Sequence, residues 1–338
     1  MRDTLDRPLR SLRISVTDRC NLRCHYCMPE DEYVWLPRPD LLRFEEVGYL
    51  ADLFGELGVT RIRLTGGEPL LRRDLPELVS ALAAKPWLED LALTTNGVVL
   101  ADQAEALKRA GLHRLTVSLD TLNRDRFAAL AGRDALPAVL EGVDAARRAG
   151  FTSLKVDAVI TRGDNDDELT ELLDYGQTID GEVRFIEYMD VGGATDWRAD
   201  KVVTRQEMLS RLTDHYGPVT SISEESSAPA ARFRLPNGTT FGIISSTTEP
   251  FCRTCDRARL TADGVLFLCL YAQAGTDLRR PLRAGAVKAT LLNLIKAVWQ
   301  GRADRGAEER TRVDSRGTYI PVNILKKNAH LEMHTRGG

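Results

Sequence analysis

Six cysteines, grouped into two triplets, are the residues of this 338-residue chain whose types and spacing most clearly indicate chemistry. The first triplet has the spacing C-x3-C-x2-C and consists of Cys20, Cys24 and Cys27. Three thiolates this close could bind three irons of a [4Fe–4S] cluster and leave the fourth iron open for another ligand. Structural zinc sites use paired C-x2-C units instead, so the first triplet favours a catalytic iron–sulfur cluster.

The second triplet has the spacing C-x2-C-x13-C and consists of Cys252, Cys255 and Cys269. One interpretation is half a zinc site, completed by a histidine such as His330 or His334. The other is a second cluster, beside which Arg257 and Arg259 would attract an anion. Three disulfides are disfavoured, because disulfide frameworks are typical of short secreted domains and this chain is long.

Short β-rich segments alternate with amphipathic helical stretches over the first 190 residues. Three of those stretches end in Gly58, Gly111 and Gly150, as expected of helix C-caps. Serial βα units predict a parallel sheet with helices packed outside it. No dinucleotide-binding glycine motif follows the first strand, so we expect an incomplete (β/α)6 barrel. The expected strands are 12–17, 61–65, 90–95, 114–120, 154–161 and 183–189.

Alternation of side chains along these strands predicts one aliphatic and one polar face. The polar face collects charged and hydroxylic groups such as Arg13, Arg63, Ser118, Lys155 and Asp157. A filled barrel core would not tolerate these groups. The polar face could simply be solvated, but parallel sheets are usually covered on both sides, so we expect a polar lumen that holds a ligand.

The pattern changes after residue 190, where loops, a helix at 203–217 and two hairpins are expected. The hairpin turns are predicted at Asn237-Gly238 and Asp263-Gly264, and a last helix near 285–300. We therefore expect an α/β protein with two domains. Residues 1–190 would form the barrel, and residues 191–338 a smaller α+β region that carries the second cysteine triplet.

Composition excludes several classes of function. The formal net charge is −3, so no basic surface predicts nucleic-acid binding, and an anionic ligand would need local arginines. No apolar run reaches the length of a membrane span, and the N-terminus does not look like a signal peptide. We expect a soluble, cytoplasmic protein.

Two motifs together resemble the radical S-adenosylmethionine (SAM) superfamily. They are CNLRCHYC, which holds the first triplet, and Gly66-Gly67-Glu68-Pro69 after the second expected strand. Further segments, including RFIEYMDVG, FCRTCDRARLTADG and the terminal Gly337-Gly338, are similar to the GTP 3′,8-cyclase family of molybdenum cofactor biosynthesis. The segment NILKKNAHLEMHTR before the terminal glycines departs from that family's pattern.

The resemblance implies two [4Fe–4S] clusters, one on each triplet, with SAM on the first and GTP at the second. The implied SAM-binding residues are Tyr26, Gly67, Ser118 and Met189. The implied GTP-binding residues are Arg13, Arg63, Thr94, Lys155, Arg257, Ala258 and Arg259. Gly337 and Gly338 would extend into the active site and serve catalysis. Arg72 and Arg73 are left unassigned.

By the same resemblance, a 5′-deoxyadenosyl radical would abstract hydrogen from C3′ of GTP, and C3′ would then attack C8 of guanine. One electron and one proton would complete 3′,8-cyclo-7,8-dihydro-GTP. The implied partners are an electron donor and cyclic pyranopterin monophosphate synthase downstream, and a homodimer is plausible. The alternatives are a peptide-modifying radical SAM enzyme with an auxiliary cluster and a non-enzymatic zinc-binding module.

Overall fold

Six parallel strands form the centre of the computed structural model, which describes residues 1–223 and 227–337. They follow chain order in the sheet, and each pairs with the next in parallel. The strands are β1 (Ser11–Ser15), β2 (Arg61–Thr65), β3 (Asp90–Thr95), β4 (Arg114–Ser118), β5 (Lys155–Ile160) and β6 (Glu182–Glu187). The predicted incomplete (β/α)6 barrel is confirmed, and the expected strand bounds differ from these by only one or two residues.

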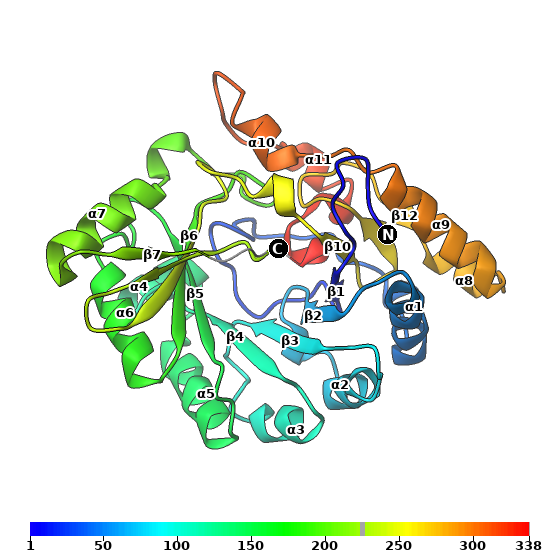
Figure 1. Cartoon of the computed structure of the whole chain (residues 1–338), viewed down its shortest axis with the longest axis horizontal. Coiled ribbons are helices and arrows are strands. Elements are labelled where there is room, and N and C mark those ends of the chain that lie inside the picture. Colours follow the sequence, from blue (N-terminus) through cyan, green and yellow to red (C-terminus); the bar gives the residue numbers. More distant parts are fainter. Residues whose placement is uncertain (224–226, 338) are drawn as a thin grey trace.

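Helices cover the outer face of this curved sheet (Figure 1). Leucines and valines on their inner sides join the aliphatic strand face in one large core. The predicted C-cap glycines Gly58, Gly111 and Gly150 all have positive φ, which stops each helix before the next strand. The barrel helices are α1 (Phe44–Glu56), α2 (Leu75–Ala83), α3 (Ala104–Arg109), α4 (Arg124–Ala131), α5 (Leu136–Arg148) and α6 (Leu169–Thr178).

The inner face of the sheet is polar, as the alternation predicted. Leu12 and Ile14 of β1 are buried in the core, whereas Arg13 and Ser15 lie on the opposite, inner face. Arg63 of β2 also lies inside, where its Nη1 donates to Thr94 Oγ1 at 2.9 Å and Thr116 Oγ1 at 3.0 Å. Arg63 is therefore hydrogen-bonded inside the barrel, whereas the buried Ser15 Oγ and Asp157 Oδ1 have no hydrogen-bond partner among the described residues.

The C-terminal region extends the sheet at both edges. Strand β10 pairs in parallel with β1, and β9 pairs in parallel with β6. Beyond β10 and β9, two further antiparallel strands on each side complete a sheet of twelve strands. Their order is β12-β11-β10-β1-β2-β3-β4-β5-β6-β9-β8-β7. The added strands are β7 (Thr220–Ile222), β8 (Ala231–Arg234), β9 (Thr240–Ile244), β10 (Arg257–Leu260), β11 (Val265–Phe267) and β12 (Thr276–Asp277).

Both predicted hairpins are present, with Gly238 and Gly264 at positive φ in their turns. The expected appended region is in fact continuous with the barrel sheet, because each hairpin supplies a strand to one of its open edges. The division of the chain into two domains at residue 190 stays a prediction. The remaining helices are α7 (Arg205–Tyr216), α8 (Arg279–Arg283), α9 (Lys288–Gln300), α10 (Gly306–Arg310) and α11 (Val322–Leu325).

Within residues 1–223 and 227–337, no helix combines the length and the apolar character needed to cross a membrane. The last described residues return to the open mouth of the barrel, near β10 and β1 (Figure 1). The tail therefore approaches the carboxyl ends of the strands, where sites form in barrels of this kind.

Candidate active site

The first cysteine triplet lies on the loop that leaves the carboxyl end of β1. Its last two cysteines share one tight turn, because the backbone N–H groups of Cys27 and Met28 both donate to the carbonyl of Cys24, at 3.0 and 2.7 Å. All three thiols are partly buried and line a common cavity. Burial raises the pKa of each thiol, so the thiolates would need a positive partner such as an iron cluster.

The glycines after β2 let a second loop pack closely on the cysteine loop. A Cβ on Gly66 would lie 2.2 Å from the carbonyl oxygen of Thr17, and one on Gly67 would lie 2.3 Å from that of Arg19. Only glycine permits these approaches, and Gly66 also has φ of +138°. The predicted SAM contact Gly67 thus lies directly against the loop of the first triplet.

Glu68 follows these glycines and is fully buried, a position to which the sequence analysis gave no role. Its carboxylate accepts hydrogen bonds from Thr95 Oγ1 at 2.7 Å and from the backbone N–H groups of Leu70 and Asn96 at 2.9 and 2.7 Å. Burial raises the pKa of Glu68 to about 7. Glu68 therefore links the loops after β2 and β3. In the second of these loops, Asn96 Nδ2 lies 3.8 Å from Cys20 Sγ of the first triplet.

Asp120, which follows β4, is a second acidic residue for which the sequence patterns predicted no role. It accepts from Tyr26 OH at 2.9 Å and from Val159 N–H at 2.8 Å, and burial raises its pKa to about 6. Tyr26 is therefore fixed beside the first triplet. The other predicted SAM contacts, Ser118 and Met189, line the same cavity.

The second triplet lies where a short turn, Cys252–Thr254, leads into β10. Cys255 Sγ accepts from Arg257 Nη2 at 3.4 Å and Arg302 Nη2 at 3.3 Å, and Cys269 Sγ accepts from Tyr271 N–H at 3.5 Å. Burial alone would raise the pKa of Cys255, but the two guanidinium groups lower that pKa to about 6. Such N–H···S contacts are typical of cluster thiolates.

Both triplets open into one cavity of about 290 Å³. Arg13, Arg257 and Arg259 line it as well. The tertiary structure therefore joins residues that lie more than half the chain apart in the sequence. It places a group of cations in the same cavity as the two sets of thiols.

The arginines of the cavity carry more positive charge than their neighbours neutralise. Burial lowers the pKa of Arg13 well below its ordinary value, and repulsion from Arg259, Arg63 and Arg257 lowers it further. Burial and Arg257 lower the pKa of Arg259 to about 10, so Arg259 still carries its charge near neutral pH. A polyanion bound here would relieve the repulsion, as expected of a triphosphate site.

The four remaining predicted GTP contacts, Thr94, Lys155, Arg63 and Ala258, differ in their surroundings. Thr94 lines the cavity. Lys155 Nζ forms an ion pair with Glu182 Oε1 at 3.0 Å, and Arg63 Nη1 donates to the hydroxyl groups of Thr94 and Thr116. Ala258 is fully buried in the core, at the position of β10 that pairs with Leu12 of β1.

The C-terminal tail reaches the arginines. The carbonyl oxygen of Gly337 accepts from Arg13 Nη1 at 2.8 Å and Arg259 Nη1 at 2.6 Å. Gly337 has φ of +66°, and a Cβ there would lie 2.2 Å from Thr65 Cγ2. The predicted partner glycine, Gly338, lies outside the described residues.

Across the described ranges, no three or more His, Cys, Asp or Glu side chains are grouped closely enough to bind one ion. An iron–sulfur cube instead binds each thiolate on a separate iron and needs the sulfurs spread apart. His330, one candidate fourth zinc ligand, lies 2.8 Å from Asp263 Oδ2. The other, His334, packs against Tyr33 and Trp35.

Comparison with known proteins agrees with this arrangement. The radical SAM superfamily profile matches residues 14–176, and the profile described as Molybdenum Cofactor Synthesis C matches residues 181–308. Streptococcus suis SuiB bound to its precursor peptide SuiA has a TM-score of 0.62 over 91% of this chain and 67% of that one, at 17% identity. That likeness concerns the fold. The fold and the first triplet define a radical SAM enzyme.

Curated relatives resemble the chain along its whole length. GTP 3′,8-cyclase 3 of Mycobacterium bovis is 54% identical and covers 100% of this chain and 90% of its own. GTP 3′,8-cyclase of Staphylococcus aureus is 42% identical, over 92% of this chain and 93% of its own. The chain belongs to the GTP 3′,8-cyclase family, which acts in molybdenum cofactor biosynthesis.

Proposed function

We propose that this chain joins C3′ of the GTP ribose to C8 of guanine and releases 3′,8-cyclo-7,8-dihydro-GTP, the first step of molybdenum cofactor biosynthesis. Family membership supports the reaction. One observation carries the assignment of the site. A single cavity is lined by both cysteine triplets and by Arg13, Arg257 and Arg259.

In this proposal Cys20, Cys24 and Cys27 hold the first [4Fe–4S] cluster. With SAM bound and one electron supplied, the chemistry of this cofactor pair would be reductive cleavage of SAM to methionine and a 5′-deoxyadenosyl radical. The protein's part is to hold SAM in a fixed place. Gly67 packs against the backbone of the cysteine loop, and Asp120 fixes the phenol of Tyr26 beside that loop. Gly67, Tyr26, Ser118 and Met189 all line the cavity in which SAM would bind.

The second triplet fits a second cluster by its donor set. Three thiols line the cavity, and two of them already accept N–H or guanidinium hydrogen bonds. With only three cysteine ligands, one iron would stay open to the guanine base. This arrangement would hold GTP by its base at one end of the cavity.

Arginines hold the other end of GTP in this proposal. Guanidinium forks match phosphate oxygens, and in a buried cavity each contact is stronger than in water. Arg13 and Arg259 now donate to the carbonyl of Gly337, so the tail and the substrate meet at the same cations. Gly337 and Gly338 would then act by positioning the substrate.

The proposal extends to partners and location. The reaction needs an electron donor, and its product is the substrate of a cyclic pyranopterin monophosphate synthase. A homodimer and a cytoplasmic location remain part of the proposal. The cytoplasm supplies GTP and keeps free thiols reduced.

The test of function is anaerobic incubation of the reconstituted protein with GTP, SAM and dithionite. We expect 5′-deoxyadenosine and the cyclised nucleotide to form together, and only when GTP is present. Formation of 5′-deoxyadenosine at the same rate without GTP would contradict the proposed substrate.

Iron content tests the cofactors separately. Two clusters require about eight irons and eight sulfides per chain. About four irons would refute the second cluster alone. Stoichiometric zinc without a brown chromophore would favour the zinc-binding alternative.

A further inference from the structure

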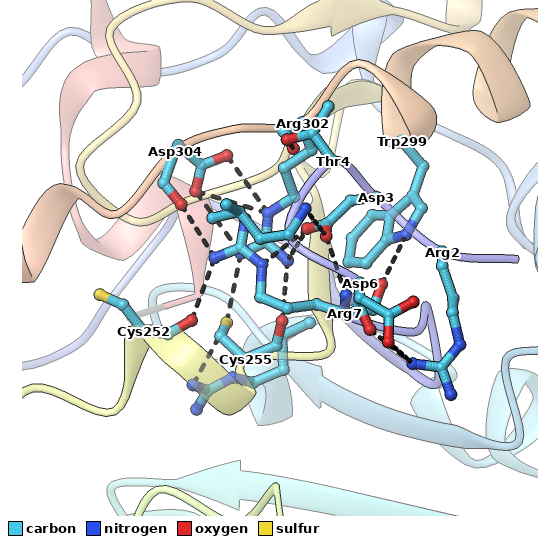
Figure 2. Close-up of polar contacts among 12 residues, drawn as sticks. Arg2, Asp3, Thr4, Asp6, Arg7, Cys252, Cys255, Trp299, Arg302 and Asp304 are labelled. Carbon is cyan, nitrogen blue, oxygen red and sulfur yellow. Dashed lines mark hydrogen bonds and ion pairs between the residues drawn. The ribbon is translucent and has the colours of Figure 1, made fainter.

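The first seven residues form a folded arm that lies next to Cys252 and Cys255 of the second triplet (Figure 2). Asp3 holds the arm's turn together, because its Oδ1 accepts from the backbone N–H groups of Leu5 and Arg7, each at 2.9 Å. Asp3 Oδ2 accepts from Arg7 Nε at 2.6 Å. The side chains of Asp3 and Arg7 are 0% and 1% exposed, so this pair is sealed from solvent.

Arg7 connects the arm to the first cysteine of the triplet. Its Nη1 donates to the carbonyl oxygens of Cys252 at 3.0 Å and Asp304 at 2.9 Å. The arm thereby fixes the backbone of the Cys252 turn to the segment that follows α9. Arg7 touches the backbone rather than a thiol, so its role is structural support.

Arg302 makes the contact with the sulfur itself. Its Nη1 donates to the carbonyl of Cys255 at 2.8 Å, and its Nη2 donates to Cys255 Sγ at 3.3 Å (Figure 2). Its guanidinium also lies 4.7 Å above the Trp299 ring, and the Trp299 indole N–H donates to the Arg7 carbonyl at 3.4 Å. Arg302 is therefore held in one orientation by the arm and by α9.

Two acidic side chains, Asp3 and Asp304, lie close to the guanidinium group of Arg302. Arg302 lies 3.7 Å from Asp3, and its side chain is 1% exposed. Asp3 faces two buried arginines, and Arg302 Nε also pairs with Asp304 Oδ2 at 3.2 Å, on a carboxylate that is 29% exposed. The two acids therefore balance the charges of Arg7 and Arg302 and hold the Arg302 guanidinium in place. The N–H donated to Cys255 Sγ is the contact that Arg302 makes toward the cluster.

We infer that Arg302, held by the N-terminal arm, is a positioning residue for the second cluster. It orients Cys255 and sets the reduction potential of that cluster. The inference rests on the proposed second cluster. Arg257 also donates to Cys255 Sγ, but it lines the cavity and is a candidate GTP contact. Arg302 is not one of the residues that line the cavity, so it can contact Cys255 without contacting the substrate.

The test uses the full-length chain with Cys20, Cys24 and Cys27 replaced by serine, so that only the second cluster forms. Three variants are compared in it: Arg302→Gln, Arg302→Lys and, as control, the exposed Arg312→Gln. Each is reconstituted anaerobically, assayed for iron, and titrated redox-potentiometrically with detection by electron paramagnetic resonance. Thermal unfolding reports whether each variant is folded.

For Arg302→Gln we expect a shift of the midpoint potential to lower values, because a positive charge and an N–H···S hydrogen bond both favour the reduced cluster. Arg302→Lys, which keeps the charge, should shift less, and Arg312→Gln should not shift. Loss of iron in the glutamine variant with retention in the lysine variant would equally support positioning.

An unchanged potential and iron content in Arg302→Gln would overturn the inference. Equal unfolding of both Arg302 variants would also overturn it, since it would show a purely structural residue. Failure of the proposed second cluster looks different, because the unmodified chain would then bind about four irons and the triple-serine chain none.

Discussion

Arg257 and Arg259 alternate with core residues on one strand, yet their surroundings differ. Arg257 donates to Cys255 Sγ, whereas Arg259 is almost fully buried and donates to the carbonyls of Arg336 and Gly337. A change at Arg257 would therefore disturb a thiol as well as a substrate contact. Arg259 is the cleaner probe of anion binding.

Arg259→Ala should weaken GTP binding roughly ten- to a hundred-fold, because it removes a charge-assisted hydrogen-bond donor from a buried site. Iron content should stay unchanged, since Arg259 directs its hydrogen bonds to the backbone carbonyls of Arg336 and Gly337. Equilibrium binding of GTP to the reconstituted protein measures the effect. Arg73→Ala, at an exposed arginine, is the matched control. Loss of iron in Arg259→Ala would instead make Arg259 a structural residue.

Gly337 of the tail has no room for a side chain. Alanine there would put a methyl group 2.2 Å from Thr65 Cγ2 and strain a φ of +66°. We expect Gly337→Ala to reduce turnover roughly tenfold or more, because small displacements in an active site are costly. Iron content should not change. Gly317→Ala, where a Cβ meets nothing within 4 Å, should leave turnover unaffected.

At the scale of elements, an ion pair between α1 and α8 links the barrel to the C-terminal region. Glu46 on α1 accepts from Arg283 on α8 through both oxygens, with Nε–Oε1 at 2.8 Å and Nη2–Oε2 at 3.0 Å. Its Oε2 also accepts from the backbone N–H of Arg43 at 2.7 Å, which caps α1. The hydrogen bonds from Arg283, and to a smaller extent the one from the Arg43 backbone, lower the pKa of Glu46 to about 2.

Glu46→Gln should lower the free energy of unfolding at pH 7 by about 1–2 kcal/mol. A depressed folded-state pKa stabilises the protein fully above the ordinary value of 4.5, and this stabilisation is lost as pH falls toward 2. The difference between the two proteins should therefore shrink below pH 4.5. Urea unfolding at pH 7 and at lower pH measures it, with the exposed Glu45→Gln as control. A difference independent of pH would contradict the assignment.

At the scale of the whole molecule, the sheet is shared between the barrel and the C-terminal region. Residues Ser11 to Ile14 of β1 pair with Arg257 to Leu260 of β10, and β6 pairs with β9. Removal of the C-terminal region would expose both barrel edges, as well as the inner face near the tail. Exposed strand edges promote association with other chains.

The fragment 1–190 should therefore fail to fold as a stable monomer. We expect it to aggregate or to unfold without a cooperative transition, whereas the full chain unfolds in one. Size-exclusion chromatography and circular dichroism melting compare the two. A monomeric fragment with a sharp transition would show that residues 1–190 are an independent domain.

The parts that could be predicted from sequence depend on local patterns. The six barrel strands follow from runs such as LRISVT, in which side chains alternate, and the helix ends follow from glycines such as Gly58. The short helices α8, α10 and α11 carry too few residues for a periodic signal. Glu68 and Asp120 were overlooked as site residues, because their importance comes from burial and partners.

The sequence by itself determined the class of chemistry, because cysteine spacing within a few residues fixes how many thiols a loop can offer. It also determined the barrel and its polar lumen, which depend on the alternation of neighbouring residues. Only the tertiary structure decided which distant residues meet. Pairing of β10 with β1 brings Arg259 beside Arg13, and the folded arm brings Arg302 to Cys255. Such long-range contacts depend on packing across the whole chain, so no local pattern contains them.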